Sequence, residues 1–276
     1  MTNLAPTITL AHGAELPALG LGTWPLTGAE AAAAVRSALQ AGYRLIDTAE
    51  NYGNEDAVGQ GLRDSGVPRE EVFLTTKFNR KWHSVDGARQ AAEASLRRLG
   101  VDYLDLLLIH WPNPDQGTYD DAFAGLVTLL EAGVVRAIGT SNFKPAHLQK
   151  VIDVTGVVPD VNQINLNPYA TRNASVAFDA GHGIVTEAWS PLKPASLLSD
   201  QVVVAIAEAH GRTPAQTVLR WHVQHGYVPI PKSSALARQQ ENLAVFDFEL
   251  APDELAAIDA LDRGEAHVED SDTFGH

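Results

Sequence analysis

Four ionisable side chains in the first half of the chain stand at the ends of short apolar runs or just beyond them: Asp47, Tyr52, Lys77 and His110. A tyrosine alone has a pKa of about 10 and is a poor proton donor at neutral pH. A nearby lysine ammonium lowers that pKa, and an aspartate beside the lysine keeps it charged and in place. A histidine can donate a hydrogen bond to a substrate oxygen or relay a proton. The set suits proton transfer to an oxygen that is becoming an alkoxide, as in carbonyl reduction.

Each of these residues also has a structural interpretation. A lone aspartate after a strand often caps a turn, and a lone tyrosine in a loop usually packs. Lys77 could be a surface lysine, and His110 could be a core histidine bonded to backbone. All four at one end of successive strands are much harder to attribute to chance. No nucleophile with an adjacent base is evident, so the set does not suit acyl transfer.

The elements that must position these residues alternate along the chain. Runs with strand character are followed by runs with apolar residues at helical spacing. The strand-like runs are apolar on both faces, which suits a parallel sheet covered by helices. The expected strands are residues 17–23, 44–48, 72–77, 103–110, 134–141, 161–165, 183–189 and 227–232. The expected helices are residues 29–41, 54–65, 86–99, 119–132, 145–154, 172–181, 201–210, 214–225 and 238–245.

Eight strand–helix units in about 230 residues predict an α/β protein with a closed (β/α)8 TIM barrel. A doubly wound open sheet is the alternative. No linker or composition break indicates a second domain, so residues 1–276 are expected to form one. Residues from about 7 to 17 predict a hairpin that turns near Gly13 and could plug the bottom of the barrel. The polar tail, about 262–276, is expected to be either disordered or laid over the barrel top.

Position on the strands filters the candidate residues, because chemistry in such barrels sits at the C-terminal strand ends. Asp47 ends the second expected strand, and Tyr52 lies in the loop beyond it. Lys77 ends the third strand and His110 the fourth. Four titratable groups from three adjacent strands are therefore expected to converge on one rim.

The composition excludes several classes of protein. Of the 276 residues, 45% are hydrophobic and 20% charged, as in ordinary globular proteins. The chain has no cysteine, which rules out disulfides and thiolate metal sites. A formal net charge of −14 disfavours nucleic acid and anionic membranes as partners. The N-terminus lacks signal-peptide features, and no apolar run approaches the ~20 residues of a membrane span. We therefore expect a cytoplasmic protein.

A series of short motifs identifies a family resemblance. The motifs are LIDTAENYGNE at 45–55, TTK at 75–77, LIHWP at 108–112, GTSNF at 139–143, NQI at 162–164, WSPL at 189–192 and IPKSS at 230–234. In this order and spacing they resemble the aldo-keto reductase family from about residue 7 to residue 262. Within it, the chain is similar to the bacterial branch of 2,5-diketo-D-gluconate reductases. The resemblance implies a metal-free monomer that uses NADPH to reduce aldehydes or ketones, including diketones or keto sugars.

The resemblance also implies roles for individual residues. Tyr52 would be the general acid, Asp47 and Lys77 the pair that tunes it, and His110 the group that orients the carbonyl. NADPH would lie extended across the top of the barrel. Ser141, Asn142 and Gln163 would hold its nicotinamide carboxamide, and Trp189 would stack on the ring. Thr23, Ser190 and Leu192 would complete the cofactor contacts, with the last two near the pyrophosphate.

The segment after the last expected strand predicts a phosphate site from its residues alone. It opens a helix, for which Ser233 or Ser234 is a plausible N-cap. A helix N-terminus offers free N–H groups and a positive dipole end, to which Lys232 and Arg238 add charge. The resemblance places the adenosine 2′-phosphate here and matches Glu241 and Asn242 to adenine-binding positions. Ala235 replaces the Thr or basic residue of many relatives, so use of NADH is also possible, although Arg238 favours NADPH.

Three tryptophans are expected at the rim where the catalytic set converges. Trp24 and Trp111 follow the first and fourth strands, and Trp82 lies in the loop after the third. They could form an aromatic-walled substrate pocket, with the C-terminal tail along its border. Two other functions stay open at this stage: a barrel that binds a nucleotide without turnover, as a redox sensor or partner subunit, and a metal-dependent barrel hydrolase or isomerase.

Overall fold

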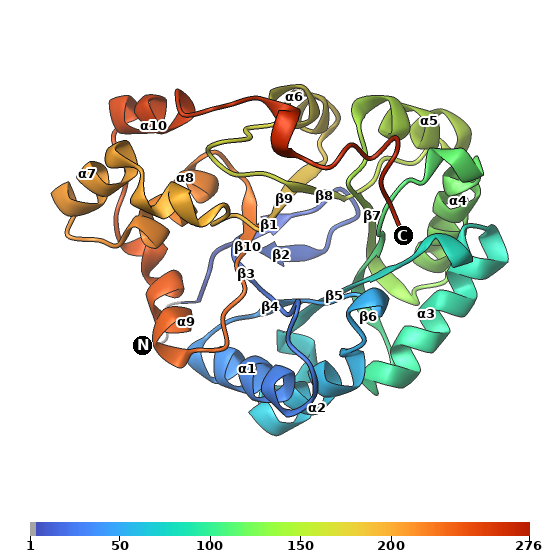
Figure 1. The fold of residues 1–276 in the computed structure, drawn as a ribbon. Helices are drawn as coiled ribbons and strands as arrows, with labels where there is room; N and C mark the ends of the chain where they lie inside the picture. Colours follow the sequence, from blue (N-terminus) through green and yellow to red (C-terminus); the bar gives the residue numbers. More distant parts are fainter. Residues whose placement is uncertain (1–3) are drawn as a thin grey trace.

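The computed structural model describes residues 4–276, which contain one eight-stranded parallel sheet with its strands in sequence order (Figure 1). Helices surround the strands on all sides in this view. The strands are β3 (Gly20–Gly22), β4 (Leu45–Asp47), β5 (Phe73–Phe78), β6 (Leu104–Ile109), β7 (Val135–Ser141), β8 (Val161–Asn165), β9 (Val185–Trp189) and β10 (Val228–Ile230). The predicted barrel is confirmed, and the alternative of an open sheet is wrong because β3 and β10 meet.

Glycines allow the barrel to close between β3 and β10. The Gly22 N–H donates to the Pro231 carbonyl at 3.1 Å, and Gly22 forms a parallel bridge with Lys232. A Cβ atom on Gly22 would lie 3.1 Å from the Ile230 carbonyl oxygen, and one on Gly20 would lie 2.7 Å from the Ile230 Cδ1 atom. Glycines in β3 therefore allow its backbone to approach Ile230 of β10 closely.

The helices match the expected ranges to within two residues at either end. They are α1 (Gly28–Ala41), α2 (Glu55–Ser65), α3 (Val85–Leu99), α4 (Tyr119–Glu131), α5 (Pro145–Thr155), α6 (Asn173–His182), α7 (Gln201–Ala209), α8 (Pro214–Gln224) and α9 (Leu236–Leu243). Helix α3 shows why a helix begins and ends where it does. Ser84 Oγ accepts from the Gly87 N–H at its start, and Gly100 ends it at φ +68°. Helix α10 (Pro252–Asp259) was not expected.

The side chains that face the barrel interior are apolar at the bottom and polar at the top. Alternate residues of a strand share one face, so Leu106 and Leu108 of β6 point inward, and His110 follows on the same face. The same alternation runs from Val161 to Gln163 on β8. An apolar layer thus supports a polar layer at the C-terminal strand ends. A larger apolar cluster fills the space between the strands and helices.

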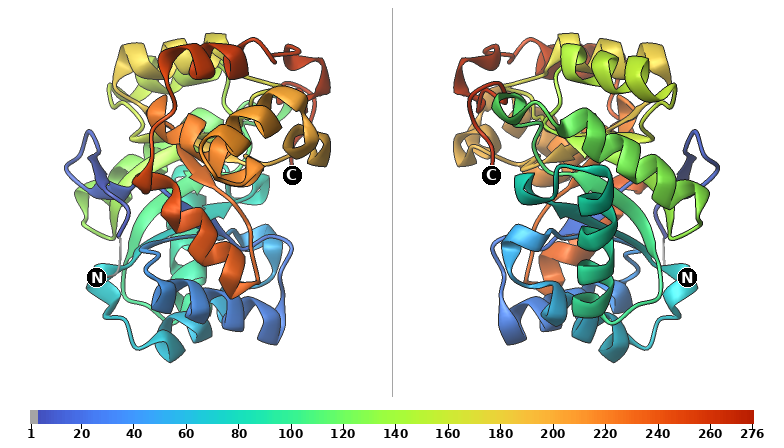
Figure 2. Two further views of the ribbon diagram at one scale, coloured as in Figure 1. Left: turned by 90° about the vertical axis from the view of Figure 1, so that its left-hand side faces the viewer. Right: turned by 90° about the vertical axis from the view of Figure 1, so that its right-hand side faces the viewer.

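The hairpin and the C-terminal tail lie at opposite ends of the barrel (Figure 2). The hairpin pairs β1 (Thr7–Thr9) with β2 (Glu15–Pro17) and turns at Gly13, where φ is +86°. Leu10 and Leu16 pack into the interior cluster, so the hairpin closes the bottom, as expected. The tail crosses the strand ends at the top, where the Phe274 ring lies 4.9 Å from the Trp111 ring. The tail is therefore laid over the barrel top, which is one of its two expected arrangements, and is not disordered.

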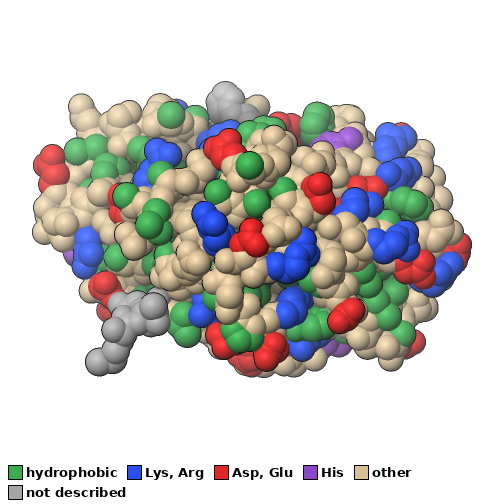
Figure 3. Space-filling model, turned by 90° about the horizontal axis from the view of Figure 1, so that it is seen from below, with side chains coloured by type: hydrophobic (Ala, Val, Ile, Leu, Met, Phe, Trp, Pro, Cys, Tyr) green, Lys and Arg blue, Asp and Glu red, His purple; other side chains and the backbone are tan. Residues whose placement is uncertain are grey.

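Charges of both signs are mixed on the surface shown in Figure 3. This is the side where α1 and α2 lie in Figure 1, and Lys and Arg side chains alternate there with Asp and Glu. Among residues 4–276, no helix has the length and apolar character needed to cross a membrane.

Candidate active site

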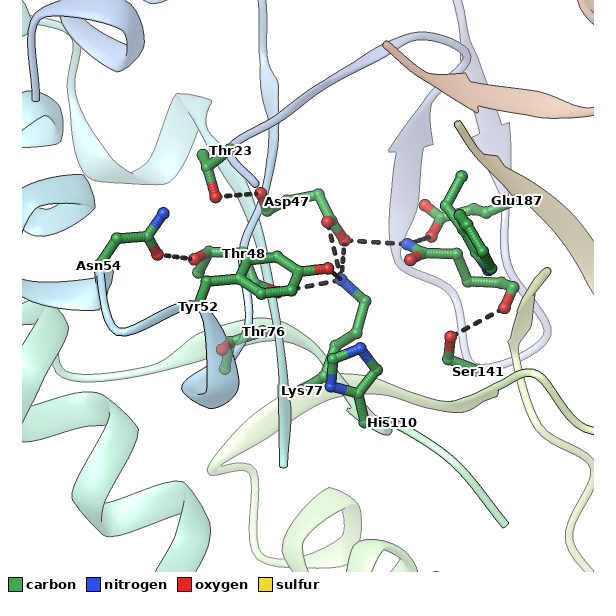
Figure 4. Close-up of polar contacts among 12 residues, drawn as sticks. Thr23, Asp47, Thr48, Tyr52, Asn54, Thr76, Lys77, His110, Ser141 and Glu187 are labelled. Atoms are coloured by element: carbon green, nitrogen blue, oxygen red, sulfur yellow. Dashed lines mark hydrogen bonds and ion pairs between the residues drawn. The ribbon is translucent and has the colours of Figure 1, made fainter. Parts of the chain in front are cut away.

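The centre of the site is an ion pair between neighbouring strands. Asp47 of β4 pairs in register with Thr75 of β5, and Lys77 lies two residues further on the same inward face. The Lys77 ammonium donates to both Asp47 carboxylate oxygens, at 2.7 and 2.8 Å, and to the Thr48 carbonyl at 3.0 Å (Figure 4). Both side chains are buried, so the two charges depend on each other and on these hydrogen bonds.

Tyr52 and His110 complete the predicted cluster. Tyr52 ends a short 3₁₀ helix, Glu50–Tyr52, that follows β4 and returns the chain over the ion pair. The Lys77 Nζ atom lies 3.4 Å from the Tyr52 hydroxyl, and the rings of Tyr52 and His110 meet edge to face at 5.8 Å. Figure 4 shows these side chains directed toward one another. The structure thus brings together all four residues that the sequence singled out, while their roles stay predictions.

The electrostatics of the cluster favour neutral rings beside a charged lysine. Burial opposes the Lys77 ammonium, but Asp47 and Tyr52 outweigh it and raise the pKa of Lys77. Burial, together with the positive charge of Lys77 and the proximity of His276, holds the pKa of His110 well below its usual value. The imidazole of His110 is therefore neutral at pH 7 and can donate one N–H.

The expected lowering of the Tyr52 pKa is not the net result. Removal of the phenol from water is the largest influence and raises its pKa. The attraction of Lys77 lowers the pKa, as expected, but does not offset burial, and the charge of Asp47 raises the pKa further. The net shift of the Tyr52 pKa is upward because burial is the largest influence and the charge of Asp47 offsets part of the attraction of Lys77. Tyr52 consequently keeps its proton at neutral pH.

Three of the expected cofactor residues form a connected group on the other side of the cavity. The Asn142 amide donates to the His110 carbonyl at 3.1 Å and to Ser141 Oγ at 3.0 Å. Its oxygen accepts from the Trp189 indole N–H at 2.9 Å, which fixes the indole in the cavity wall. Asn142 also has φ +63°, a conformation that asparagine tolerates better than most residues.

A large cavity joins the catalytic cluster to this group. It has a volume of about 1090 Å³ and opens at the C-terminal strand ends. The predicted residues that line it are Thr23, Trp24, Asp47, Tyr52, His110, Trp111, Ser141, Asn142, Gln163, Trp189, Ser190, Leu192 and Lys232. The predicted residues that do not line it are Lys77, Trp82, Ser233, Arg238, Glu241 and Asn242.

Trp82 does not form the substrate wall that was expected of it. Its indole N–H donates to both carboxylate oxygens of Glu50, at 3.1 and 3.0 Å, and its ring packs at the edge of the outer core. Glu50 also forms an ion pair with Lys81 at 2.5 Å. The loop after β5 thus holds the turn that carries Tyr52, and Trp82 supports the site from outside the cavity.

The segment after β10 carries exposed positive charge, but its helix is not capped by a serine. Helix α9 starts at Leu236 with Ala235 as its N-cap, so the expectation of a Ser233 or Ser234 cap is wrong. Ser233 instead bonds within the turn, accepting from the Ala235 N–H at 3.2 Å. Lys232 and Arg238 are exposed, and neither side chain forms a hydrogen bond or ion pair with another described residue.

The two expected adenine-binding residues lie further along α9. Glu241 is partly exposed, and its carboxylate accepts from the Thr213 hydroxyl at 2.5 Å. The side chain of Asn242 is buried. Only the exposed part of Glu241 is free to meet a ligand in this arrangement.

The tail supplies part of the cavity wall. The His276 ring lies 4.9 Å from the His110 ring, and Phe274 covers Trp111. Lys144 fastens the tail through ion pairs with Asp270 and Asp272. The sequence predicted that the tail lies beside the pocket, but it did not indicate that Lys144 holds the tail or that His110 and Trp111 contact it.

Glu187 is a buried acid that the sequence reasoning missed. Its side chain is fully buried on β9, and Gln163 donates to it at 2.8 Å. Burial, followed by the negative charge of Asp47, raises the pKa of Glu187 to about 8. A signal was present, because a glutamate inside the apolar run VTEAW is unusual for a buried strand. Among the described residues, no group of three or more His, Asp or Glu side chains is arranged to hold a metal ion.

Comparisons with known proteins agree with this architecture. The sequence profile of the Aldo/keto reductase family matches residues 18–263. The chain is 50% identical to an aldo-keto reductase of Mycolicibacterium vanbaalenii, over 99% of both chains. It is 47% identical to 2,5-diketo-D-gluconic acid reductase B of a Corynebacterium species, over 97% of both chains. A solved structure of a Gox0644 variant in complex with NADPH superposes with a TM-score of 0.94, at 43% identity over 99% of both chains. The chain therefore belongs to the aldo/keto reductase family.

Proposed function

We propose that this reductase transfers a hydride from NADPH to the carbonyl carbon of a small aldehyde or ketone, with Tyr52 as the proton donor. The observation that carries the proposal is the bonded array of Asp47, Lys77 and Tyr52, which opens into the cavity beside a neutral His110. The alternative of a nucleotide-binding barrel without turnover would leave this buried array without a use. The NADPH complex of a structural neighbour supports the choice of cofactor.

The protein groups account for the movement of the proton. When bound, NADPH supplies the hydride that adds to the carbonyl carbon. As the C=O electron pair moves onto oxygen, the Tyr52 hydroxyl gives its proton to that oxygen, and His110 donates a hydrogen bond to it. Lys77 stabilises the phenolate that remains, and Asp47 holds Lys77 in place. Solvent then returns a proton to Tyr52.

The cavity fits a nicotinamide cofactor. Trp189 offers a flat indole that is held in the wall by Asn142, and the Gln163 amide oxygen has no partner among the described residues. We assign the carboxamide to Ser141, Asn142 and Gln163, with Thr23, Ser190 and Leu192 along the cofactor. The 2′-phosphate would meet Lys232, Arg238 and the N-terminus of α9, and the adenine would lie near Glu241 and Asn242.

The substrate end of the cavity has aromatic walls. Trp24, Trp111, Phe274 and His276 line it, and a planar carbonyl compound or the apolar face of a sugar can stack on such surfaces. The relative from Corynebacterium is a 2,5-diketo-D-gluconic acid reductase, which supports diketones and keto sugars as candidates. A panel of aldehydes, diketones and keto sugars, followed by NADPH and NADH oxidation, will rank them. The monomeric state and cytoplasmic location stay predictions, for sedimentation and cell fractionation to test.

Replacement of Tyr52 by phenylalanine tests the acid role. Removal of the hydroxyl should lower kcat/KM for carbonyl reduction by about 10³-fold or more, because no other proton donor is equally placed. The affinity for NADPH, measured by tryptophan fluorescence quenching, should change less than about 2-fold. Tyr227→Phe, which removes a hydroxyl away from the cavity, is the matched control and should keep its activity. Turnover in the Tyr52→Phe variant close to that of the parent would remove Tyr52 from this role.

A further inference from the structure

The Gln163 amide is held by two carboxyl groups from opposite directions. Its nitrogen donates to Asp47 at 2.9 Å and to Glu187 at 2.8 Å, as the dashed lines between Asp47 and Glu187 show in Figure 4. An amide nitrogen carries two hydrogens, so both are used. Gln163 and Glu187 are register partners on β8 and β9, which places their side chains together on the inward face.

This arrangement fixes which way the amide points. If the Gln163 amide were reversed, its oxygen would face the Asp47 carboxylate, which can only accept, and both of its hydrogens would lose their present partners. In the observed orientation the oxygen has no partner among the described residues, and Gln163 lines the cavity. Gln163 therefore presents a hydrogen-bond acceptor, and no donor, to whatever the cavity binds.

Glu187 has no other evident use. It is fully buried, forms no ion pair with a described residue, and one of its carboxyl oxygens has no hydrogen-bond partner. Burial of such a group costs stability, and an apolar residue of the same size would avoid that cost. Glu187 is also absent from the route of the proton, which runs through Tyr52 and Lys77.

We propose that Glu187 is a positioning residue for the Gln163 amide. By accepting one N–H while Asp47 accepts the other, Glu187 holds the amide oxygen toward the cavity, where it accepts from the amide N–H of the bound nicotinamide. The inference rests on the proposed cofactor site and adds the residue that orients it. The raised pKa of Glu187 is compatible with this role, because the carbonyl oxygen of a neutral carboxyl still accepts a hydrogen bond.

The test compares two substitutions of similar volume. Glu187→Gln keeps an oxygen that can accept from Gln163, whereas Glu187→Met does not. We expect Glu187→Met to weaken binding of NADP⁺ by about 10-fold or more, and Glu187→Gln to stay within about 3-fold of the parent. Binding of 2′,5′-ADP, which has the adenosine phosphates but no nicotinamide, should be unchanged in both. Quenching of tryptophan fluorescence reports each dissociation constant, since Trp24 and Trp189 line the cavity.

The 3-acetylpyridine analogue of NADP⁺ provides a second measurement. It has no amide N–H to donate, so the parent protein should bind it about 10-fold more weakly than NADP⁺. Glu187→Met should lose most of this discrimination, because its Gln163 amide is free to reverse. If Glu187→Met lost affinity for NADP⁺ and for 2′,5′-ADP equally, the role of Glu187 would be merely structural and the inference would be overturned. Unchanged affinity of this variant for NADP⁺ would also overturn it. If the parent protein bound neither ligand, the cofactor site itself would be wrong.

Discussion

The two ends of the proposed cofactor site are built in opposite ways. At the ends of β4 and β5, Asp47 and Lys77 are buried and already bonded to each other. After β10, the side chains of Lys232 and Arg238 are exposed and have no partner among the described residues. A buried charge must be compensated within the protein, because desolvation is costly, whereas an exposed charge is compensated by water. The catalytic end is therefore preassembled, and the phosphate end depends on its ligand for contacts.

This difference teaches that the same kind of substitution should have different consequences at the two ends. Removing a charge at the buried end disturbs both folding and chemistry, because its partner is left uncompensated. Removing a charge at the exposed end should lower affinity for a phosphate and leave folding unchanged. The following variants separate these outcomes.

Lys77→Met should have the largest effect. It leaves the Asp47 carboxylate buried without its cation, which should lower the free energy of unfolding by about 3–5 kcal/mol. It should also reduce kcat/KM by about 10³-fold or more, because a Tyr52 phenolate would be unstabilised. Urea unfolding and steady-state kinetics measure the two effects. The double variant Asp47→Asn with Lys77→Met should recover part of the stability but none of the activity. Full stability in Lys77→Met would contradict the proposed interdependence.

Arg238→Ala should have an intermediate effect that is confined to binding. Loss of the guanidinium should raise the KM for NADPH by about 30-fold and leave the KM for NADH nearly unchanged. The unfolding free energy should stay within about 0.5 kcal/mol of the parent value. Arg97→Ala, which removes an exposed arginine on α3, is the matched control. Equal losses with both cofactors would break the assignment of Arg238 to the phosphate.

Asp179 is a buried carboxyl that, unlike Asp47, has no cation among the described residues hydrogen-bonded to it. Asp179 of α6 accepts from Thr186 at 2.9 Å and from Asn162 at 3.3 Å, and burial raises the pKa of Asp179 to about 7. The folded protein therefore holds this proton between about pH 4 and pH 7, where the unfolded chain has released it. Its contribution to stability is greatest below pH 4 and declines as the pH rises through 7.

Asp179→Asn should remove this decline, and the expected effect is the smallest of the three. The loss of unfolding free energy between pH 5 and pH 8 should be about 1–2 kcal/mol smaller than in the parent protein. Urea titrations at several pH values measure it, with Asp64→Asn on exposed α2 surface as the control. An identical pH dependence in the variant and the parent would place the titration elsewhere.

The barrel and the catalytic cluster were predictable because both depend on regular patterns. The alternation of apolar strands and amphipathic helices fixes the order of elements, and position at a strand end fixes where Asp47, Lys77 and His110 lie. The same alternation along β9 places Glu187 on the inward face. Its role depends on Gln163, which is its partner on the neighbouring strand although it lies 24 residues earlier in the chain. Residues on regular strands can therefore be placed from the sequence pattern alone.

The remaining features depend on contacts that the local sequence does not reveal. Trp82 turns away from the cavity because Glu50, 32 residues earlier, accepts its N–H. Ser233 bonds within its own turn and leaves the start of α9 to Ala235. For Tyr52, the sequence indicated the neighbouring lysine, but the amount of burial that outweighs it comes only from the three-dimensional structure.

The tail has a consequence for how selectivity could evolve. Phe274 and His276 belong to no strand or helix of the barrel, and ion pairs at partly exposed positions fasten the segment to Lys144. Mutations or insertions there can reshape the entrance without disturbing the hydrophobic layers that keep the protein folded. New substrate preferences can therefore arise by exchange of this short peptide, while the reaction chemistry is inherited intact.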